Sequence, residues 1–270
     1  MKKLVFTLIL VLGMAAAAYA IPVLQVGVEN GSGWYLPYTA SSSNPIETDT
    51  AITNGSSFVV GGLVAPTTTP GGKTITEYLG GKIGAGYDWS NYGLPAETFN
   101  GHGALLLVSV PDGTGSAASG SLRINGDAAF AWDAVNNYFP NNHDPVKEDV
   151  ADFLFFDIGS FSSNPNTVPD FSIQPPPASP EKKAGEIKFF TIAGIGNLAW
   201  LHFDVMAIQT LVTVNGTTEY SNRLENNPGS HDVTEPPAPP VTTVPEPGTL
   251  VLLGAGLFGL GIFCRRRMSK

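Results

Sequence analysis

Apolar and polar side chains alternate from Leu201 to Val205, and the apolar spacing continues to Ala207. Successive side chains of a β-strand point to opposite faces, so alternation of this kind predicts a strand with one apolar face. His202 and Asp204 would share the opposite face. The apolar face would be formed by four side chains: Leu201, Phe203, Val205 and Ala207.

Other short apolar runs resemble this strand and recur along the chain. They are Leu24–Glu29, Phe58–Val64, Ala104–Val110, Phe153–Ile158 and Glu186–Ile192. Asparagine followed by glycine, a pair that tight hairpin turns favour, occurs at Asn30, Asn54, Asn100, Asn125 and Asn215. Short strands with such turns predict an all-β fold, a single β-sandwich-like domain over residues 21–227. Long Pro/Gly-rich loops are expected at 65–72 and 164–180.

The N-terminus has the organisation of a secretory signal peptide. Lys2 and Lys3 precede an apolar stretch over residues 4–18. Ala18 and Ala20 fit an A-x-A cleavage site, so signal peptidase is expected to release a mature chain that begins at Ile21. We therefore expect residues 1–20 to form a signal helix and the rest to be exported.

The C-terminus has the organisation of a short membrane anchor. Residues 250–264 are fifteen uncharged residues, and a helix of that length spans about 22 Å of a hydrocarbon core about 30 Å thick. Arg265, Arg266 and Arg267 follow and would stay in the cytoplasm, so residues 265–270 form a basic cytoplasmic end. Before the span, the Pro/Thr/acidic segment 228–244 is predicted to be an extended stalk.

The order of these C-terminal features resembles a known sorting signal. Pro245, Glu246 and Pro247 precede the Gly/Leu-rich span and the three arginines, and this order is similar to the PEP-CTERM signal of Gram-negative bacteria over residues 245–270. The resemblance implies that exosortase recognises the Pro-Glu-Pro motif. The chain would be anchored transiently in the inner membrane and then passed to the cell surface or the extracellular matrix.

A second resemblance concerns the exported domain. Three blocks, Leu24–Gly31, Trp200–Asp204 and Ser230–Asp232, are similar to the choice-of-anchor N proteins. This family consists of exported bacterial proteins that often carry a PEP-CTERM tail. The resemblance implies a surface protein and supplies no catalytic residues.

Charge and cysteine content exclude several classes of function. Between Ile21 and Val244 there are 8 Lys and Arg against 22 Asp and Glu, a formal charge of −14. Such a domain is a poor partner for nucleic acid or for anionic lipid, both of which need basic patches. The only cysteine, Cys264, lies in the C-terminal span. The exported domain therefore has no disulfide and no thiol nucleophile.

Two groups of side chains are weak candidates for a metal or acid–base site. The densest group of hard-cation ligands is His143, Asp144, Glu148, Asp149 and Asp152. Its spacing matches no known calcium loop, so a solvated acidic loop is the favoured interpretation, and we expect no metal or cofactor. His202 and Asp204 could form half of a site that His231 and Asp232 complete. The favoured interpretation is a polar outer face that hydrogen-bonds the end of the chain onto the sheet.

Aromatic side chains gather in two segments that we expect to be loops. They are Trp34, Tyr35, Tyr38, Tyr87, Trp89 and Tyr92. Exposed rings could stack on sugars, or the same rings could close the ends of a sandwich core. The preferred hypothesis is a non-enzymatic structural or adhesive domain associated with exopolysaccharide. The alternative is an exported glycan hydrolase, which would need two facing carboxylates. The sequence assigns no catalytic residue.

Overall fold

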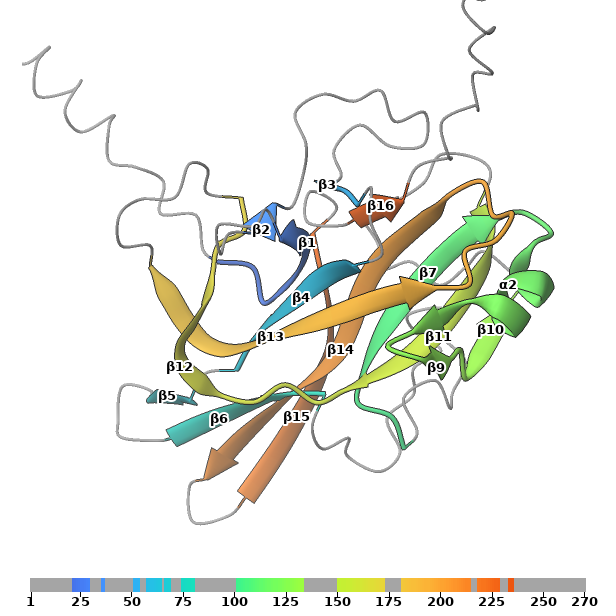
Figure 1. The fold of residues 1–270 in the computed structure, drawn as a ribbon. Helices are drawn as coiled ribbons and strands as arrows, with labels where there is room; N and C mark the ends of the chain where they lie inside the picture. Colours follow the sequence, from blue (N-terminus) through green and yellow to red (C-terminus); the bar gives the residue numbers. More distant parts are fainter. Residues whose placement is uncertain are drawn as a thin grey trace, which may run out of the picture. The chain divides into compact units, whose positions relative to one another are not determined.

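A computed structural model describes most of the exported domain. The described residues are 21–29, 35–36, 51–53, 57–64, 66–68, 74–80, 101–133, 150–172, 181–214, 218–228 and 233–235. The chain divides into two units, Met1–Pro237 and Ala238–Lys270, and every described residue belongs to the first. This first unit is β-rich, as predicted, and among the described residues it contains one short helix, α2 (Gly115–Ser121) (Figure 1).

The first of two sheets is built around a central pair of strands, β4 and β13. The strand order is β2-β1-β4-β13-β8-β9, and β12 pairs with another part of β13. All of its pairs are antiparallel. The strands are β1 (Leu24–Glu29), β2 (Tyr35–Leu36), β4 (Ser57–Leu63), β8 (Arg123–Ile124), β9 (Asp127–Ala128), β12 (Asn164–Pro169) and β13 (Lys182–Ala193).

The second sheet is built around the long strand β14. Its order is β10-β11-β7-β14-β16-β3, with β15 and β6 also paired to β14 and β5 paired to β6. All of these pairs are antiparallel except β16 and β3. The strands are β3 (Ala51–Ile52), β5 (Pro66–Thr68), β6 (Thr74–Leu79), β7 (Ala104–Pro111), β10 (Ala131–Asp133), β11 (Val150–Gly159), β14 (Leu201–Val214), β15 (Thr218–Asn226) and β16 (Val233–Glu235).

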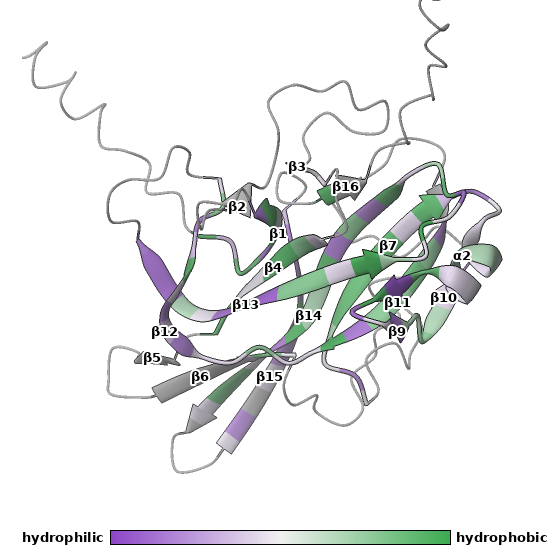
Figure 2. Cartoon of the chain, viewed as in Figure 1, coloured by the Kyte–Doolittle hydropathy of each residue, from purple (hydrophilic) through white to green (hydrophobic). Residues whose placement is uncertain are grey.

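The two sheets share one hydrophobic core. Phe58 of β4 stacks on Phe203 of β14 with ring centroids 4.6 Å apart, and on Phe190 of β13 at 5.3 Å. The apolar side chains that face between the sheets come from β1, β4 and β13 on one side and from β7, β11 and β14 on the other. Each such large side chain contributes roughly 1.5–3 kcal/mol by leaving water. Hydrophobic residues accordingly run along β4 and β7, whereas β9 and β12 are more hydrophilic (Figure 2).

All six predicted strands are present, and several are longer than predicted. The strand that starts at Leu201 continues to Val214, and the run at Glu186–Ile192 lies within β13. The Asn-Gly prediction is confirmed at Asn125 and Gly126, which have φ of 53° and 90° and join β8 to β9. Positive φ at both positions is what a tight hairpin turn requires. The other four asparagines of this set fall outside the described residues.

Three segments expected in loops contain strands instead, which corrects the sequence analysis. Pro66 begins β5 and Pro169 ends β12, and among the described strands each of these two pairs with one neighbour. Proline lacks an N–H to donate, and edge strands tolerate it for that reason. Tyr35, which we placed among loop aromatics, lies in β2 and pairs with Glu29 of β1.

The end of the domain also differs from the predicted boundary at residue 227. Val233–Glu235 form β16, which pairs with Leu201–Phe203 of β14, and the side chain of Val233 is fully buried in the core. This short strand lies in the segment that we assigned to the stalk. Its apolar residue and sheet pairing place it in the folded domain, which extends at least to Glu235.

The predicted terminal helices lie outside the described residues. The signal helix (1–20) and the span (250–264) belong to this undescribed part, and so do residues 236–249. Within the part of the chain that the structure describes, no helix is both long and apolar enough to cross a membrane.

The closest backbone approach in the first sheet gives a test of the packing. A Cβ atom added at Gly185 of β13 would lie 2.1 Å from the carbonyl oxygen of Gly62 and 2.9 Å from Val168 Cγ2. Backbone cannot move aside cheaply, so we expect Gly185→Ala to lower the free energy of unfolding by about 1–3 kcal/mol or more. Urea unfolding of the purified chain measures this change.

Gly120→Ala is the matched control, because a Cβ at Gly120 of α2 would meet nothing within 4 Å. Alanine is the better helix former, so this variant should be unchanged or more stable by up to about 1 kcal/mol. Equal effects of the two substitutions would contradict the pairing of β13 with β4.

Candidate functional site

The predicted metal-ligand group is represented in the structure by a single residue. His143, Asp144, Glu148 and Asp149 lie outside the described residues. Asp152 is buried, and its carboxylate accepts a hydrogen bond from the backbone N–H of Gly115 at 2.6 Å. This contact fixes the start of α2 against β11. Among the described residues, no group of three or more His, Cys, Asp or Glu side chains could hold a metal ion.

His202 and Asp204 lie together on β14, but their face is not exposed. Their side chains are 0% and 3% exposed, and His202 Nε2 lies 3.1 Å from Asp204 Oδ2. The prediction of a polar outer face was therefore wrong about solvent. The same face of the second sheet carries further buried side chains, including Leu105, Leu107 and Ser109 of β7.

Asn227 connects this buried pair to the end of the domain. Its Nδ2 donates to Asp204 Oδ1 at 2.8 Å, and its Oδ1 accepts from the backbone N–H of Val205 at 2.8 Å. The backbone N–H of Asn227 donates in turn to the Val205 carbonyl at 3.2 Å. Hydrogen bonding between this face and the end of the chain is thus present, through Asn227. His231 and Asp232, the other proposed partners, fall outside the described residues.

The His202–Asp204–Asn227 group acts as a structural clamp. A buried polar group needs hydrogen bonds to replace its lost hydration. Asn227 supplies one to Asp204, and its bonds to the Val205 backbone hold it against β14. Because His202 and Asp204 are almost completely shielded from solvent, a polymeric or soluble substrate does not reach them in this state.

A second histidine–aspartate pair lies at the surface, and the sequence analysis did not find it. His102 Nδ1 lies 3.2 Å from Asp157 Oδ2, with side-chain exposures of 29% and 38%. Asp157 Oδ1 accepts hydrogen bonds from the backbone N–H groups of Gly103 (3.1 Å) and Gly159 (2.8 Å). The pair exists because Gly159 at the end of β11 lies opposite Ala104 at the start of β7.

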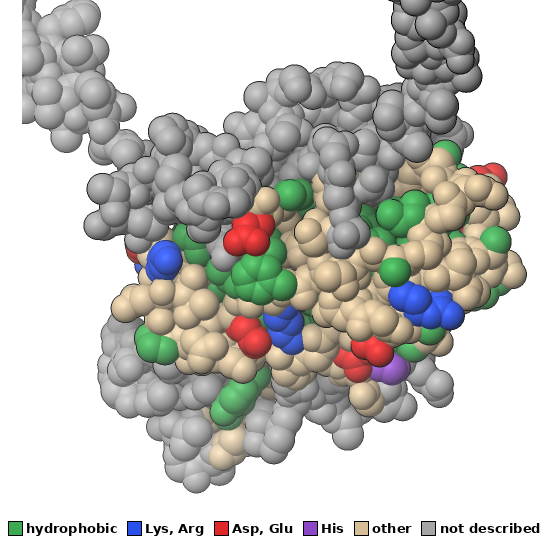
Figure 3. All heavy atoms as spheres, in the orientation of Figure 1, with side chains coloured by type: hydrophobic (Ala, Val, Ile, Leu, Met, Phe, Trp, Pro, Cys, Tyr) green, Lys and Arg blue, Asp and Glu red, His purple; other side chains and the backbone are tan. Residues whose placement is uncertain are grey.

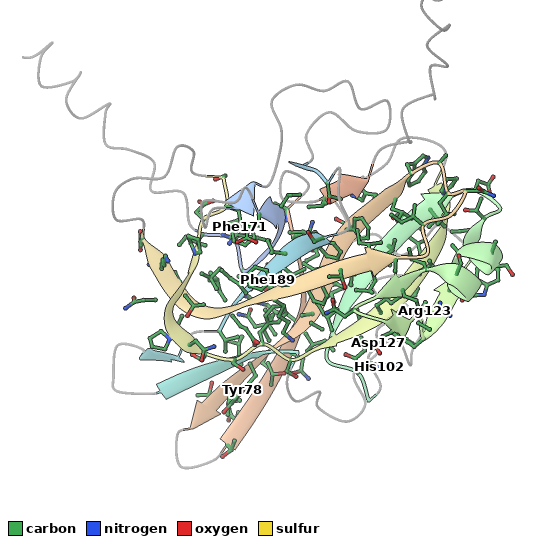
Figure 4. All side chains as sticks on the ribbon, viewed as in Figure 1. Tyr78, His102, Arg123, Asp127, Phe171 and Phe189 are labelled. Carbon is green, nitrogen blue, oxygen red and sulfur yellow. The ribbon has the colours of Figure 1, made fainter. Side chains whose placement is uncertain are left out.

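An aromatic ring completes this surface group. Phe130, between β9 and β10, stacks on the His102 imidazole with ring centroids 3.9 Å apart and planes inclined by 20°. The Phe130 ring also packs near Phe155, with ring centroids 6.2 Å apart. Of the surface of Phe130, 39% remains exposed. We call Phe130, His102 and Asp157 the surface triad. A histidine beside acidic side chains is visible on the molecular surface in Figure 3, and Figure 4 labels His102 with Arg123 and Asp127 in the same region.

The surroundings of Asp157 favour its ionised form. Partial burial raises the pKa of Asp157, but the hydrogen bonds from Gly159 and Gly103, together with His102, outweigh burial and hold the pKa below its ordinary value of 3.8. Hydrogen bonds to a carboxylate stabilise the charged state. At neutral pH, Asp157 is therefore an ionised hydrogen-bond acceptor.

A lysine from the other sheet lies near this carboxylate. Lys188 Nζ of β13 donates to the carbonyl oxygens of Ile158 and Ser160 and lies 4.7 Å from the ring centroid of Phe161. Burial lowers the pKa of Lys188 below 10.5, although Glu186 and Asp157 oppose that shift. The ammonium group thus ties the end of β11 to β13.

The aromatic residues proposed as sugar platforms are largely outside the described part of the chain. The residues outside the described part are Trp34, Tyr38, Tyr87, Trp89 and Tyr92. Of Tyr35 the structure describes only its position in strand β2. The described part exposes other large apolar side chains instead. They are Tyr78, Phe130, Trp132 and Phe189.

Comparison with known protein families identifies the C-terminal segment. Residues 243–267 match the PEP-CTERM protein-sorting motif. This motif implies export through the envelope of a Gram-negative bacterium and sorting by exosortase to the surface. No similar chain is found among curated proteins or among solved structures. The similarity to the choice-of-anchor N proteins receives no support from these comparisons.

Removing the clamp should destabilise the domain. Asn227→Ala deletes two hydrogen bonds from a fully buried side chain, so we expect the free energy of unfolding to fall by about 2–3 kcal/mol. Ser221→Ala, on the exposed side of β15, should change it by less than about 0.5 kcal/mol. Chemical denaturation at neutral pH compares them, and equal stabilities would show that Asn227 is not a clamp.

The surface pair gives a prediction about pH. Because the folded-state pKa of Asp157 is depressed, its ionised form stabilises the domain above the unfolded value near 3.8, and this contribution is lost as pH falls through the folded pKa. Asp157→Asn should therefore lower the free energy of unfolding at pH 7, by less than about 1 kcal/mol because solvent screens this partly exposed carboxylate. The difference from wild type should shrink as pH falls below about 4.

Thermal unfolding between pH 7 and pH 2.5 measures this difference. Asp127→Asn is the control, since Asp127 is an exposed carboxylate on β9. A penalty for Asp157→Asn that stays constant across this range would contradict the assigned role of its charge.

Proposed function

We propose that the exported domain is a non-enzymatic structural or adhesive module associated with exopolysaccharide. The PEP-CTERM motif indicates where the protein is sent, because it implies an exosortase-sorted protein exported to the cell surface. A protein delivered there meets surface polysaccharide. The domain's formal charge of −14 over residues 21–244 makes uncharged or cationic polymers better partners than anionic ones.

The observation that carries the proposal is how three of the described aspartates are used. Asp152 accepts the backbone N–H of Gly115 at the start of α2, Asp204 accepts from Asn227, and Asp157 accepts two backbone N–H groups. A glycan hydrolase needs a carboxylic acid with a raised pKa beside a second carboxylate. Asp157, the carboxylate of the surface histidine–aspartate pair, has a lowered pKa instead. These carboxylates fit structural and binding roles better than acid catalysis.

The proposed maturation uses both ends of the chain. Signal peptidase would cut after Ala20, leaving Ile21 as the first residue. The segment 250–264 would hold the chain in the inner membrane, with Arg265, Arg266 and Arg267 in the cytoplasm. Exosortase would then recognise Pro245, Glu246 and Pro247 and pass the domain to the cell surface or the biofilm matrix.

The alternative, a glycan hydrolase, makes a different prediction about the polymer. A binder leaves the polymer intact, whereas a hydrolase releases a new reducing end for each bond that it cuts. The two functions can therefore be separated with one protein preparation and one polymer.

We expect the purified mature chain to co-sediment with insoluble exopolysaccharide from its own cells and to release no reducing ends. The measurements are the bound fraction after centrifugation and a reducing-sugar assay over 24 hours, about a day being long compared with ordinary turnover times. Heat-unfolded chain serves as the control for trapping in the pellet. A steady release of reducing ends would favour the hydrolase, and absence of co-sedimentation would contradict the binding role.

A further inference from the structure

The surface triad places an aromatic ring, an imidazole and a carboxylate from different parts of the chain next to one another. His102 precedes β7, Phe130 lies between β9 and β10, and Asp157 belongs to β11. His102 and Asp157 are 55 residues apart in sequence. All three side chains keep between about a quarter and two fifths of their surface exposed, at 29%, 39% and 38%. Each of the three groups is therefore accessible to a ligand in solution.

The triad is held in place before any ligand arrives. Asp157 is fixed by the N–H groups of Gly103 and Gly159, and the backbone N–H of Phe130 donates to the Phe155 carbonyl at 2.9 Å. The imidazole of His102 lies between the carboxylate and the Phe130 ring. Groups that are already ordered lose little entropy on binding, which favours affinity.

The hydrogen-bonding character of the triad restricts the ligand. The Asp157 carboxylate is ionised and accepts hydrogen bonds. His102 Nδ1 lies 3.2 Å from its Oδ2, which leaves the second ring nitrogen, Nε2, for a ligand. A carboxylate and an imidazole nitrogen beside an apolar ring suit a molecule with hydroxyl groups and an apolar C–H face. They disfavour phosphate, sulfate and carboxylate groups, which bring only acceptors and negative charge.

We propose that Phe130, His102 and Asp157 form a binding subsite for one pyranose unit without an acidic group. The sugar lies across the edges of the stacked Phe130 and His102 rings, with its C–H groups against Phe130. One of its hydroxyls donates to Asp157 Oδ2 and another forms a hydrogen bond with His102 Nε2. This assignment rests on the proposed polysaccharide association and adds the place and the sugar class. A purely structural fastening of β7 to β11 requires the Asp157–glycine contacts, but it does not require Phe130 at the surface over His102.

Three oligosaccharide probes test the sugar class on the purified mature chain. They are cellohexaose, a glucosamine hexamer and an alginate hexamer, which are neutral, cationic and anionic. Calorimetry or ligand-observed NMR measures each affinity. We expect cellohexaose, the glucosamine hexamer or both to bind, and the alginate hexamer to bind at least about tenfold more weakly than the better of the two, given the charge of the site. Alginate binding as tight as the others would overturn the assignment.

Substitutions test the place. Phe130→Ala and His102→Ala should each weaken binding about tenfold, because the first removes the ring contact and the second removes a hydrogen bond with the sugar. The matched control is Phe189→Ala, which removes an exposed phenylalanine (56% exposed) from β13 of the other sheet. Its affinity should equal that of wild type. The melting temperatures of Phe130→Ala and His102→Ala, compared with wild type, separate a loss of binding from a loss of folding.

The outcomes distinguish the subsite from the broader function. If wild-type chain co-sediments with exopolysaccharide and both triad variants bind it as wild type does, the subsite is wrong while the binding function stands. If wild type binds neither the polymer nor any of the three probes, both are wrong. An equal loss of binding in Phe189→Ala would place the sugar on the other sheet and would also overturn the triad.

Discussion

The domain depends on one long strand that pairs on both sides and is buried on both faces. The first half of β14 pairs with β7 and β16, and its second half pairs with β6 and β15. Every residue from Leu201 to Thr210 is buried. A strand in this position cannot leave a polar side chain to water, so His202 and Asp204 need partners from the protein. Asn227 donates to Asp204 and so joins this pair to the residues that follow β15.

This position also explains how far the sequence could predict the fold. The alternation from Leu201 to Ala207 predicted the strand and its core-facing residues, because that signal depends only on the period of the chain. The same alternation suggested that His202 and Asp204 face solvent. The sequence pattern is identical whether a polar side chain is hydrogen-bonded to water or to another group of the protein. Short edge strands such as β5 and β12 were missed because their prolines are typical of loops as well as of edges.

The surface triad could not have been predicted for a different reason. His102, Phe130 and Asp157 belong to no motif, and their proximity follows from the antiparallel register of β11 on β7, which places Gly159 opposite Ala104. That register is a tertiary property. The signal that the sequence does contain is a glycine close to each polar residue. Gly103 follows His102, and Gly159 lies two residues after Asp157. The backbone N–H groups of both glycines donate to the Asp157 carboxylate.

The last strand of the domain and the sorting motif occupy separate parts of the sequence. Val233 is fully buried in the core, and β16 ends at Glu235. The matched motif begins at residue 243. Any processing at or after the motif therefore removes no described residue of the core, of the clamp or of the surface triad. The described stabilising contacts lie within residues 21–235, before the motif, so removal of the C-terminal signal would leave them in place.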